Sequence, residues 1–430
     1  MSLSKITDHI GYREAAFCVV FLTAVLYIKH LQRYKNYWKK QNVAYEEFEL
    51  FWKPMARLLN KPIHEIDMDR KKKYGKVFGA FDGPMPTLIV SDPDLVKLVL
   101  VKHFQTLPDR RLIKLNDPIL DNMMSLVPAD RWRKIRPAAS PAFTTGRLRK
   151  MNELIQDCAR ISIKHLLQAA EDKNEVDAKE FFGHFTLDVI ARCAFGTKLD
   201  SHSDQTNEFV SKARSAFSLK PTLPVLLTFY ICGLFPVMGK LLRIRAFGSD
   251  AFVFFKNVCL DIIKKRKLLS SAKHQDFLQL MVDAQDGGLQ AGPEGPEDAE
   301  DKLFNLGTRQ ATEQSTDSKV ITEDEALSQC VVFFIAGQDT TSSVIAYTAY
   351  LLAVHPHIQQ RLREEVDDCV KKHGEEPSVD DISKLKYLNC VISESLRLYP
   401  PAVFIDRTAC EDFTLGDSGF KLPKKCVVRI

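Results

Sequence analysis

A carboxylate and a hydroxyl stand side by side at Asp339 and Thr340, within the segment Ala336-Gly337-Gln338-Asp339-Thr340 of an apolar stretch. A glycine inside a helix costs about 1 kcal/mol relative to alanine. Hydroxyls there can bond back to the carbonyl four residues earlier and bend the helix. A buried carboxylate and hydroxyl at such a bend suit proton delivery to a bound ligand. The alternative is that one helix ends at Gly337 and a second, capped helix follows.

A second group consists of Trp132 and Arg136, which are one helical turn apart. An indole N–H and a guanidinium that point the same way can hold a carboxylate. We expect a short helix here with Asp130 as its cap. The alternative is a basic amphipathic helix on the surface.

A third group is Glu394 and Arg397, in a predicted helix that ends at Pro400-Pro401. Residues three apart share a helix face, so the two side chains can form an ion pair. Such pairs are usually solvated and contribute little, so this pair alone is weak evidence of function. The order of the three groups along the chain is more specific than any one of them.

The elements that must position these groups are mostly helical. Thr322 and Glu325 have the spacing of a capping box, which predicts a long helix from about Glu323. The apolar run 331–336 covers every face of that helix and predicts that its middle is buried. Residues 77–91 read as a hairpin of a small sheet. The fold class is therefore mainly α with a small β-sheet subdomain.

Two further stretches are unusual in composition. Residues 286–319 are rich in Gly, Pro, Ser, Thr and acidic residues and are predicted to form a flexible, acidic, exposed loop. Residues 223–239 are strongly apolar, but Pro224, Gly233 and Pro236 argue against a straight spanning helix. This second stretch is either buried core or a segment that dips into a membrane.

The N-terminus carries 14 residues without a charge, Ala15 to Ile28, followed by several basic residues and no acid up to Lys40. That length is short for a bilayer span, but flanking side chains can extend it. We expect a lumenal tail at residues 1–12, an uncleaved membrane anchor at 13–31 and the body of the chain, 32–430, in the cytosol. The alternatives are a cleaved signal or a helix that lies at the interface.

Composition excludes several classes of protein. The net charge of the 430 residues is only +5, with 60 basic and 55 acidic side chains, so a nucleic-acid binder is not indicated. The 10 cysteines stand singly, without a Cys-x-x-Cys pair. This argues against a disulfide scaffold or a zinc ribbon, and we predict no metal site made by this chain alone.

Taken together, the chain resembles a microsomal cytochrome P450, a haem-thiolate monooxygenase, and is most similar to the animal branch of drug and steroid oxidases. The resemblance runs from about residue 74 to Ile430. It rests on the three ordered groups and on these stretches: SPAFTTGRLRKM (140–151), HQDFLQLMVDAQ (274–285), FFIAGQDTTSSV (333–344), YLNCVISESLRLYPP (387–401) and LPKKCVVRI (422–430).

The resemblance implies a cytochrome P450 fold and a role for each group. It places Trp132 and Arg136 at a haem propionate and adds Ala336 and Gly337 to the residues that contact the haem. Asp339 and Thr340 would supply protons for dioxygen activation. Glu394 and Arg397 would lock the helix beside the haem to the core. The iron ligand of this family is a cysteine thiolate.

One departure from the family concerns that ligand. The haem-loop pattern Phe-x-x-Gly-x-Arg-x-Cys-x-Gly does not occur; its nearest match, from Phe304, has Ala311 in the cysteine position. Cys426 lies where the family has a strand and is not a substitute. We therefore expect a C-terminally truncated fold that lacks the haem-loop segment, with the thiolate outside this chain, and a natural protein that continues past Ile430.

Two smaller departures are the missing proline-rich hinge after the anchor, between residues 39 and 51, and Phe404, which stands where close relatives have a propionate-binding arginine. Arg407, three residues later, is not assumed to replace it.

The resemblance also implies partners and a location. The full-length protein would oxidise a small lipophilic substrate in the endoplasmic reticulum membrane. Its electrons would come from NADPH-cytochrome P450 reductase, with cytochrome b5 as a further candidate donor. The alternative is an inactive truncated fragment that acts at most as a binding or regulatory protein.

Overall fold

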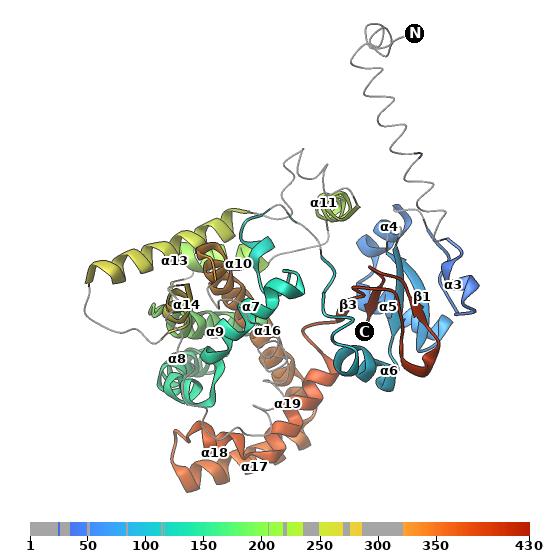
Figure 1. Cartoon of the computed structure of the whole chain (residues 1–430). Helices are drawn as coiled ribbons and strands as arrows, with labels where there is room; N and C mark the ends of the chain where they lie inside the picture. Colours follow the sequence, from blue (N-terminus) through green and yellow to red (C-terminus); the bar gives the residue numbers. More distant parts are fainter. Residues whose placement is uncertain are drawn as a thin grey trace. The chain divides into compact units, whose positions relative to one another are not determined.

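The computed structural model describes residues 25, 35–49, 52–82, 85–112, 115, 117–204, 206–217, 222–234, 249–269, 276–285 and 321–430. The predicted anchor, apart from Val25, and the predicted acidic loop lie outside these residues. The chain divides into two compact units. The first consists chiefly of residues up to Arg111 and from Val403 onward, and the second of most of the residues between (Figure 1).

The first unit contains the sheets and several short helices. Its elements are α3 (Tyr37–Lys40), α4 (Trp52–Asn60), α5 (Ile63–Tyr74), β1 (Val77–Asp82), β2 (Met85–Val90), α6 (Pro93–Lys97), the π-helix η1 (Leu98–Lys102), β3 (Asp406–Thr408), β4 (Phe413–Thr414), the 3₁₀ turn η4 (Gly416–Ser418), β5 (Lys421–Leu422) and β6 (Val427–Arg429).

The main sheet has the strand order β1-β2-β6-β3. Strands β1 and β2 are antiparallel, with Val77 opposite Val90, which confirms the predicted hairpin. Strand β6 lies parallel to β2 and antiparallel to β3, so the last strand of the chain is an inner strand of the sheet. Strands β4 and β5 form a separate antiparallel pair.

Trp38 is the fully buried anchor of this unit. Its indole Nε1 donates to the carbonyl of Ala80 at 3.0 Å. A Cβ atom on Gly79 would lie 2.3 Å from the Trp38 ring, so only glycine lets the strand come this close to the indole.

The second unit is helical. Its elements are η2 (Leu120–Asn122), α7 (Ala129–Ala139), η3 (Ser140–Phe143), α8 (Thr145–Glu171), α9 (Ala178–Phe195), α10 (Glu208–Phe217), α11 (Leu223–Leu234), α13 (Ser249–Leu269), α14 (Phe277–Gln285), α16 (Glu323–Val354), α17 (Pro356–His373), α18 (Val379–Ser383) and α19 (Lys386–Leu398). The predicted fold class, mainly helical with a small sheet, is confirmed.

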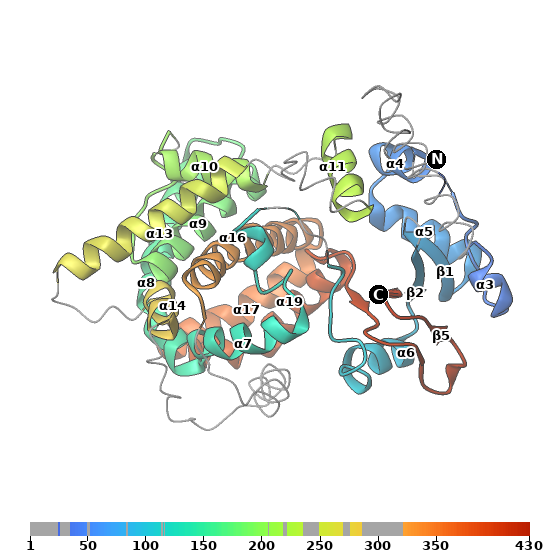
Figure 2. The ribbon, with the colours of Figure 1, turned by 45° about the horizontal axis from the view of Figure 1, so that its top comes forward.

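Helix α16 is the central element of this unit and contacts α9, α10, α13, α14, α17 and α19 (Figures 1 and 2). The capping box at its start is confirmed: Thr322 Oγ1 accepts from the Glu325 backbone N–H, and Glu325 accepts from the Thr322 backbone N–H. The helix is continuous to Val354, so the predicted alternative of a break at Gly337 is wrong. Within the described residues, α16 alone is long and apolar enough to span a bilayer, as core helices of folded proteins also can be.

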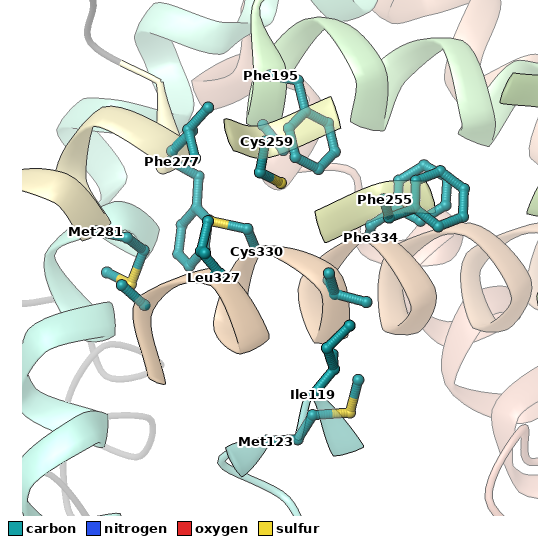
Figure 3. Packing of buried hydrophobic residues seen from close by; sticks show 14 of the residues in the cluster. Ile119, Met123, Phe195, Phe255, Cys259, Phe277, Met281, Leu327, Cys330 and Phe334 are labelled. Carbon is teal, nitrogen blue, oxygen red and sulfur yellow. The ribbon is translucent and has the colours of Figure 1, made fainter. Parts of the chain in front are cut away.

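The core of the helical unit gathers on the first half of α16. Phe334 is fully buried, and its ring centroid lies 4.3 Å from that of Phe255 and 5.3 Å from that of Phe209. Figure 3 shows Cys259 and Phe255 on one side of α16 and Ile119 and Met123 on another. Helices that are far apart in sequence therefore close over this part of α16.

Other expectations have mixed outcomes. Pro128, not Asp130, occupies the N-cap of α7; Asp130 lies in the first turn, and its expected capping role is wrong. In α11 the side chains of residues 223–228 are exposed or half-buried, so this part of the apolar stretch is not buried core. Residues 235–239 lie outside the described residues.

Candidate functional site

All eight residues singled out as candidates by the sequence lie in the helical unit. They occur on three helices: Trp132 and Arg136 on α7, the pair Glu394 and Arg397 on α19, and the remaining four on α16. Figure 1 shows α7 beside α16, and α19 contacts α16 directly. The two other candidate groups thus lie on helices next to α16.

Helix α7 and the 3₁₀ turn η3 that follows it each contact α16. Arg131 of α7 donates from Nη2 and Nε to Glu325 Oε1 at 2.6 and 3.0 Å. The ring of Phe143, at the end of η3, lies 4.9 Å from that of Phe333, measured between centroids. Arg136 belongs to the segment of the chain between these two contacts.

The ion pair with Arg131 also changes the acidity of Glu325. Burial raises the pKa of this carboxyl, but hydrogen bonds from the Thr322 backbone and from Arg131 outweigh it, and the pKa is lowered. The carboxylate therefore stays charged and serves both the cap and the helix contact.

A buried glutamine strengthens the same junction. The Gln329 side-chain oxygen accepts from the Met124 backbone at 2.9 Å, and its nitrogen donates to the carbonyls of Asn122 and Glu325 at 2.9 and 2.8 Å. Its side chain is fully buried. This residue was not identified from the sequence, because two of its partners, Met124 and Asn122, are more than 200 positions away in the chain.

Trp132 and Arg136, the predicted carboxylate-binding pair, both lie on α7. Trp132 is half-buried and packs against the main core cluster. Arg136 is also half-buried, and burial lowers the pKa of its guanidinium. A partly desolvated cation of this kind is a favourable partner for an anionic group.

On α16 the four candidates point in different directions. Ala336 and Thr340 are one turn apart and both exposed, whereas Asp339 is half-buried. A Cβ atom on Gly337 would lie 2.4 Å from Ile190 Cδ1 of α9, so this glycine serves the close packing of α9 on α16. The expected burial of the carboxylate and the hydroxyl is wrong, since Asp339 is half-buried and Thr340 is exposed.

The hydroxyl of Thr340 donates to the carbonyl of Ala336, as expected for a hydroxyl within a helix. One more carbonyl in this turn is occupied from outside the helix: Thr186 Oγ1 of α9 donates to the Gln338 carbonyl at 3.0 Å. Side chains therefore compete with the regular helix bonds at the position where the sequence predicted a bend.

Lys179, at the start of α9, holds Asp339. Its Nζ lies 2.7 Å from Asp339 Oδ1 and 2.8 Å from the Asp339 carbonyl, and 2.8 and 2.7 Å from the hydroxyls of Ser342 and Ser343. The sequence analysis missed Lys179, because no local pattern links a lysine on one helix to an aspartate 160 residues later.

Glu394 and Arg397 form the predicted ion pair, with two N–O distances of 2.7 Å. Both side chains are exposed on α19. The ring of Tyr399, just beyond α19, stacks on that of Tyr347 of α16 with centroids 4.6 Å apart and planes 5° apart. Helix α19 is thereby tied to the second half of α16.

A hollow of about 280 Å³ lies beside this junction. Its lining comes from α16, α17 and α19 and is mostly apolar: Leu351, Leu352, His355, Ile358, Tyr387, Cys390, Val391, Glu394, Ser395 and Leu398. Ala336 and Thr340 thus lie on the stretch of α16 between the α7 contacts and the α19 contacts.

Three residues of the sheet unit, Phe404, Arg407 and Cys426, were also considered in the sequence. The Phe404 ring lies under the Arg429 guanidinium, 4.9 Å from its centroid. Arg407 on β3 is half-buried, with a pKa lowered by burial and by Arg110. Cys426 is fully buried next to β6, with its Sγ 3.2 Å from the Pro86 carbonyl. Within the described residues no cluster of His, Cys, Asp and Glu could hold a metal ion.

Comparison with known proteins identifies the family of this chain. The chain matches the cytochrome P450 family model over residues 46–430. It is 32% identical over 374 residues to cytochrome P450 3A14 of Cavia porcellus, which covers 86% of this chain and 68% of the relative. It is 33% identical over 370 residues to cytochrome P450 3A30 of Fundulus heteroclitus, and the aligned part covers 85% of this chain and 68% of that relative. It is 31% identical over 415 residues to cytochrome P450 3A11 of Mus musculus, and the aligned part covers 95% of this chain and 76% of that relative. The chain belongs to the cytochrome P450 family, whose members are haem monooxygenases.

Proposed function

We propose that this chain forms the larger part of a monooxygenase that inserts one oxygen atom of O₂ into a small lipophilic substrate. Family membership supports the haem cofactor and the reaction class. The observation that carries the proposal is the open face of α16 at Ala336 and Thr340, which lies between the contacts to α7 and α19. Small side chains on an otherwise core-forming helix leave room for a flat ligand.

The residues on this face fit a haem. Ala336 and Thr340 are exposed and small, so the ring could approach the helix closely. Arg136 is a half-buried cation whose pKa is lowered by burial, and it suits a propionate. Trp132 would donate its indole N–H to the same carboxylate. Gly337 is turned toward Ile190, so its contribution is to the packing of α9 rather than to the haem face.

The thiolate ligand is proposed to lie outside residues 1–430, and these residues alone are proposed to be inactive. Cys426 is fully buried against Pro86, which leaves no open side for a metal. The family's cysteine pattern is also missing from the sequence. We expect residues 1–430, expressed alone and supplied with haem, to lack the Soret spectrum of a thiolate-bound haem. A thiolate-type spectrum from this chain would contradict the proposal.

When bound, the haem supplies dioxygen activation. The role of this chain's own residues would be to hold and transfer protons beside the haem. The Asp339 carboxylate is kept in place by Lys179, and the Thr340 hydroxyl follows it on the open face. A rotation about χ1 would release Thr340 Oγ1 from the Ala336 carbonyl and let it donate away from the helix. Thr340 Oγ1 would then carry the proton and Asp339 would restore it.

We also propose the partners and the location of the protein. The apolar segment within residues 13–31 and the basic residues after it support a single membrane anchor, with the body of the protein on the cytosolic face of the endoplasmic reticulum. NADPH-cytochrome P450 reductase would then supply the electrons, and cytochrome b5 is a further candidate. An alkaline-carbonate wash that removed the protein from membranes would contradict the anchor.

The proton role is tested by Thr340→Ala in the protein extended through its haem loop. We expect NADPH oxidation to continue while product per NADPH falls about ten-fold, because general acid catalysis contributes at least that much. The measurement is the ratio of product to NADPH consumed. Thr341→Ala is the matched control, since Thr341 is exposed on another face of α16. An unchanged ratio for Thr340→Ala would refute the role.

A further inference from the structure

A second hollow, of about 260 Å³, lies in the helical unit where α8, the end of α9 and the start of α14 meet (Figure 1). We call it the α8–α9 hollow. Its lining residues are Arg147, Lys150, Met151, Leu154, Arg192, Cys193, Gly196 and Asp276. Three cationic side chains and one carboxylate therefore form its walls, and none of these residues belongs to the site described above.

Arg192 is the most deeply placed of the three cations, with only 7% of its surface exposed. Its Nε and Nη2 atoms are buried and have no hydrogen-bond partner within the described part of the chain. Its Nη1 is 3.6 Å from Asp157 Oδ2, which is too long for a hydrogen bond. Buried donors of a charged group are costly to leave unsatisfied.

The three carboxylates near Arg192 or in the wall of the hollow already have other partners. The buried Asp188, which interacts electrostatically with Arg192, accepts from the backbone N–H and the hydroxyl of Ser201. Asp157 Oδ1 accepts from Arg160. Asp276 accepts from Arg266 through both oxygens, one of them at 2.9 Å, and from the Gln279 backbone at 3.0 Å. The single acid of the wall is thus neutralised by a cation outside it, and the hollow keeps a positive character.

We propose that the α8–α9 hollow binds a small oxyanion, a phosphate or carboxylate group carried on a small molecule. The anion's oxygens would accept from Arg192 at the bottom and from Arg147 and Lys150 at the rim. A guanidinium presents two parallel N–H groups, which match two oxygens of such a group. Met151 and Leu154 offer an apolar wall for a short carbon chain. The volume lies just below the usual range of roughly 300–1,000 Å³ for ligand pockets, which favours a ligand of few atoms.

The test is isothermal titration of the full chain in detergent, at constant ionic strength maintained with chloride. The probes are inorganic phosphate, butyl phosphate and butyrate. We expect at least one oxyanion to bind with one site per chain, and the head group that binds more tightly identifies the natural one. Heat changes no larger than those of chloride for all three probes would overturn the proposal.

Variants assign the binding to this hollow. Arg192→Gln should weaken binding about thirty-fold, because it removes hydrogen bonds from a charged donor. Lys150→Gln, at an exposed position that does not endanger folding, should weaken it about three-fold. Lys164→Gln is the matched control: the same charge is lost from an exposed position on the same helix, outside the hollow, and affinity should not change.

The apolar wall has its own variant. Leu154→Ala should weaken binding of butyl phosphate and leave binding of inorganic phosphate unchanged. Far-UV circular dichroism will show whether Arg192→Gln folds. If it does not fold, the comparison of Lys150→Gln with Lys164→Gln still tests the proposal. Equal loss of affinity in both lysine variants, or none in Lys150→Gln, would overturn the proposal.

Discussion

The two halves of helix α16 differ although both are apolar. From residue 326 to 331 every side chain is buried, and Phe334 is fully enclosed by aromatic rings from other helices. From Ala336 onward one face is open and carries Thr340, Tyr347, Tyr350 and Val354, spaced by three, four or seven residues. Residues at these spacings share a helix face.

The first half of α16 therefore forms core, and the second half carries a face that is open to a ligand. In the first half, α9, α13 and α14 supply the partners for each side of the helix. In the second half the exposed stripe begins with two small residues and continues with two tyrosines that are 44% and 54% exposed. Contiguous exposed apolar surface of this kind typically marks a site for a ligand or another segment. A haem at the small residues is the occupant we propose.

The two halves of α16 should differ most in how much a substitution changes the free energy of unfolding. Phe334→Ala should lower the free energy of unfolding by about 3–5 kcal/mol, since it leaves a cavity among the rings of Phe209 and Phe255. Tyr350→Ala, on the open face of the same helix, should change it by no more than about 0.5 kcal/mol. Urea unfolding followed by circular dichroism measures both. Similar losses in the two variants would show that the open face is packed in solution.

A substitution on the open face should instead affect the affinity for haem more than the free energy of unfolding. Ala336→Phe adds a ring to an exposed position and should leave the free energy of unfolding of the haem-free chain nearly unchanged. Overpacking typically costs about 1–3 kcal/mol, so the affinity for haem should fall about ten-fold or more. Absorbance of haem per chain measures it in the protein extended through its haem loop.

Ala353→Phe provides the control for that experiment. Ala353 is also exposed on α16 but lies outside the face of Ala336 and Thr340. Its haem content should match that of the unsubstituted protein. If both variants kept their haem, the open face at Ala336 would not be where the cofactor lies.

Local patterns in the sequence predicted the local structure well. The Thr322–Glu325 spacing predicted the start of α16, and β-type apolar residues interrupted by glycine and proline predicted the β1–β2 hairpin, because caps and hairpins depend on neighbours a few positions away. The ion pair of Glu394 with Arg397 was likewise predictable from a spacing of three.

Contacts across long distances in the chain were not predictable in this way. The apolar run 331–336 suggested burial on all sides, yet Ala336 is exposed. Periodicity shows which residues share a face, but not what covers that face. For the same reason the orientation of Gly337 toward Ile190 could not be read from the sequence, and neither could the pairing of Lys179 with Asp339.

The smallest predicted effect concerns Lys179, which connects α9 to the second half of α16. Its ammonium group has three N–H donors and four acceptors within 2.8 Å, all on the turn that begins with Asp339. Because Lys179 and Asp339 are about half exposed, the pair should add little to stability. Its effect should instead be on the position of the carboxylate.

Lys179→Met should therefore reduce kcat by no more than about five-fold, since an exposed ion pair is worth at most about 1 kcal/mol, and leave KM and the free energy of unfolding unchanged. Lys179→Arg should restore most of the rate, because a cation again reaches Asp339. Steady-state kinetics of the extended protein separate kcat from KM, with Lys164→Met as a control for the lost charge. A change in KM alone would place Lys179 in substrate binding, and unchanged kinetics would mean that Asp339 keeps its position without the lysine.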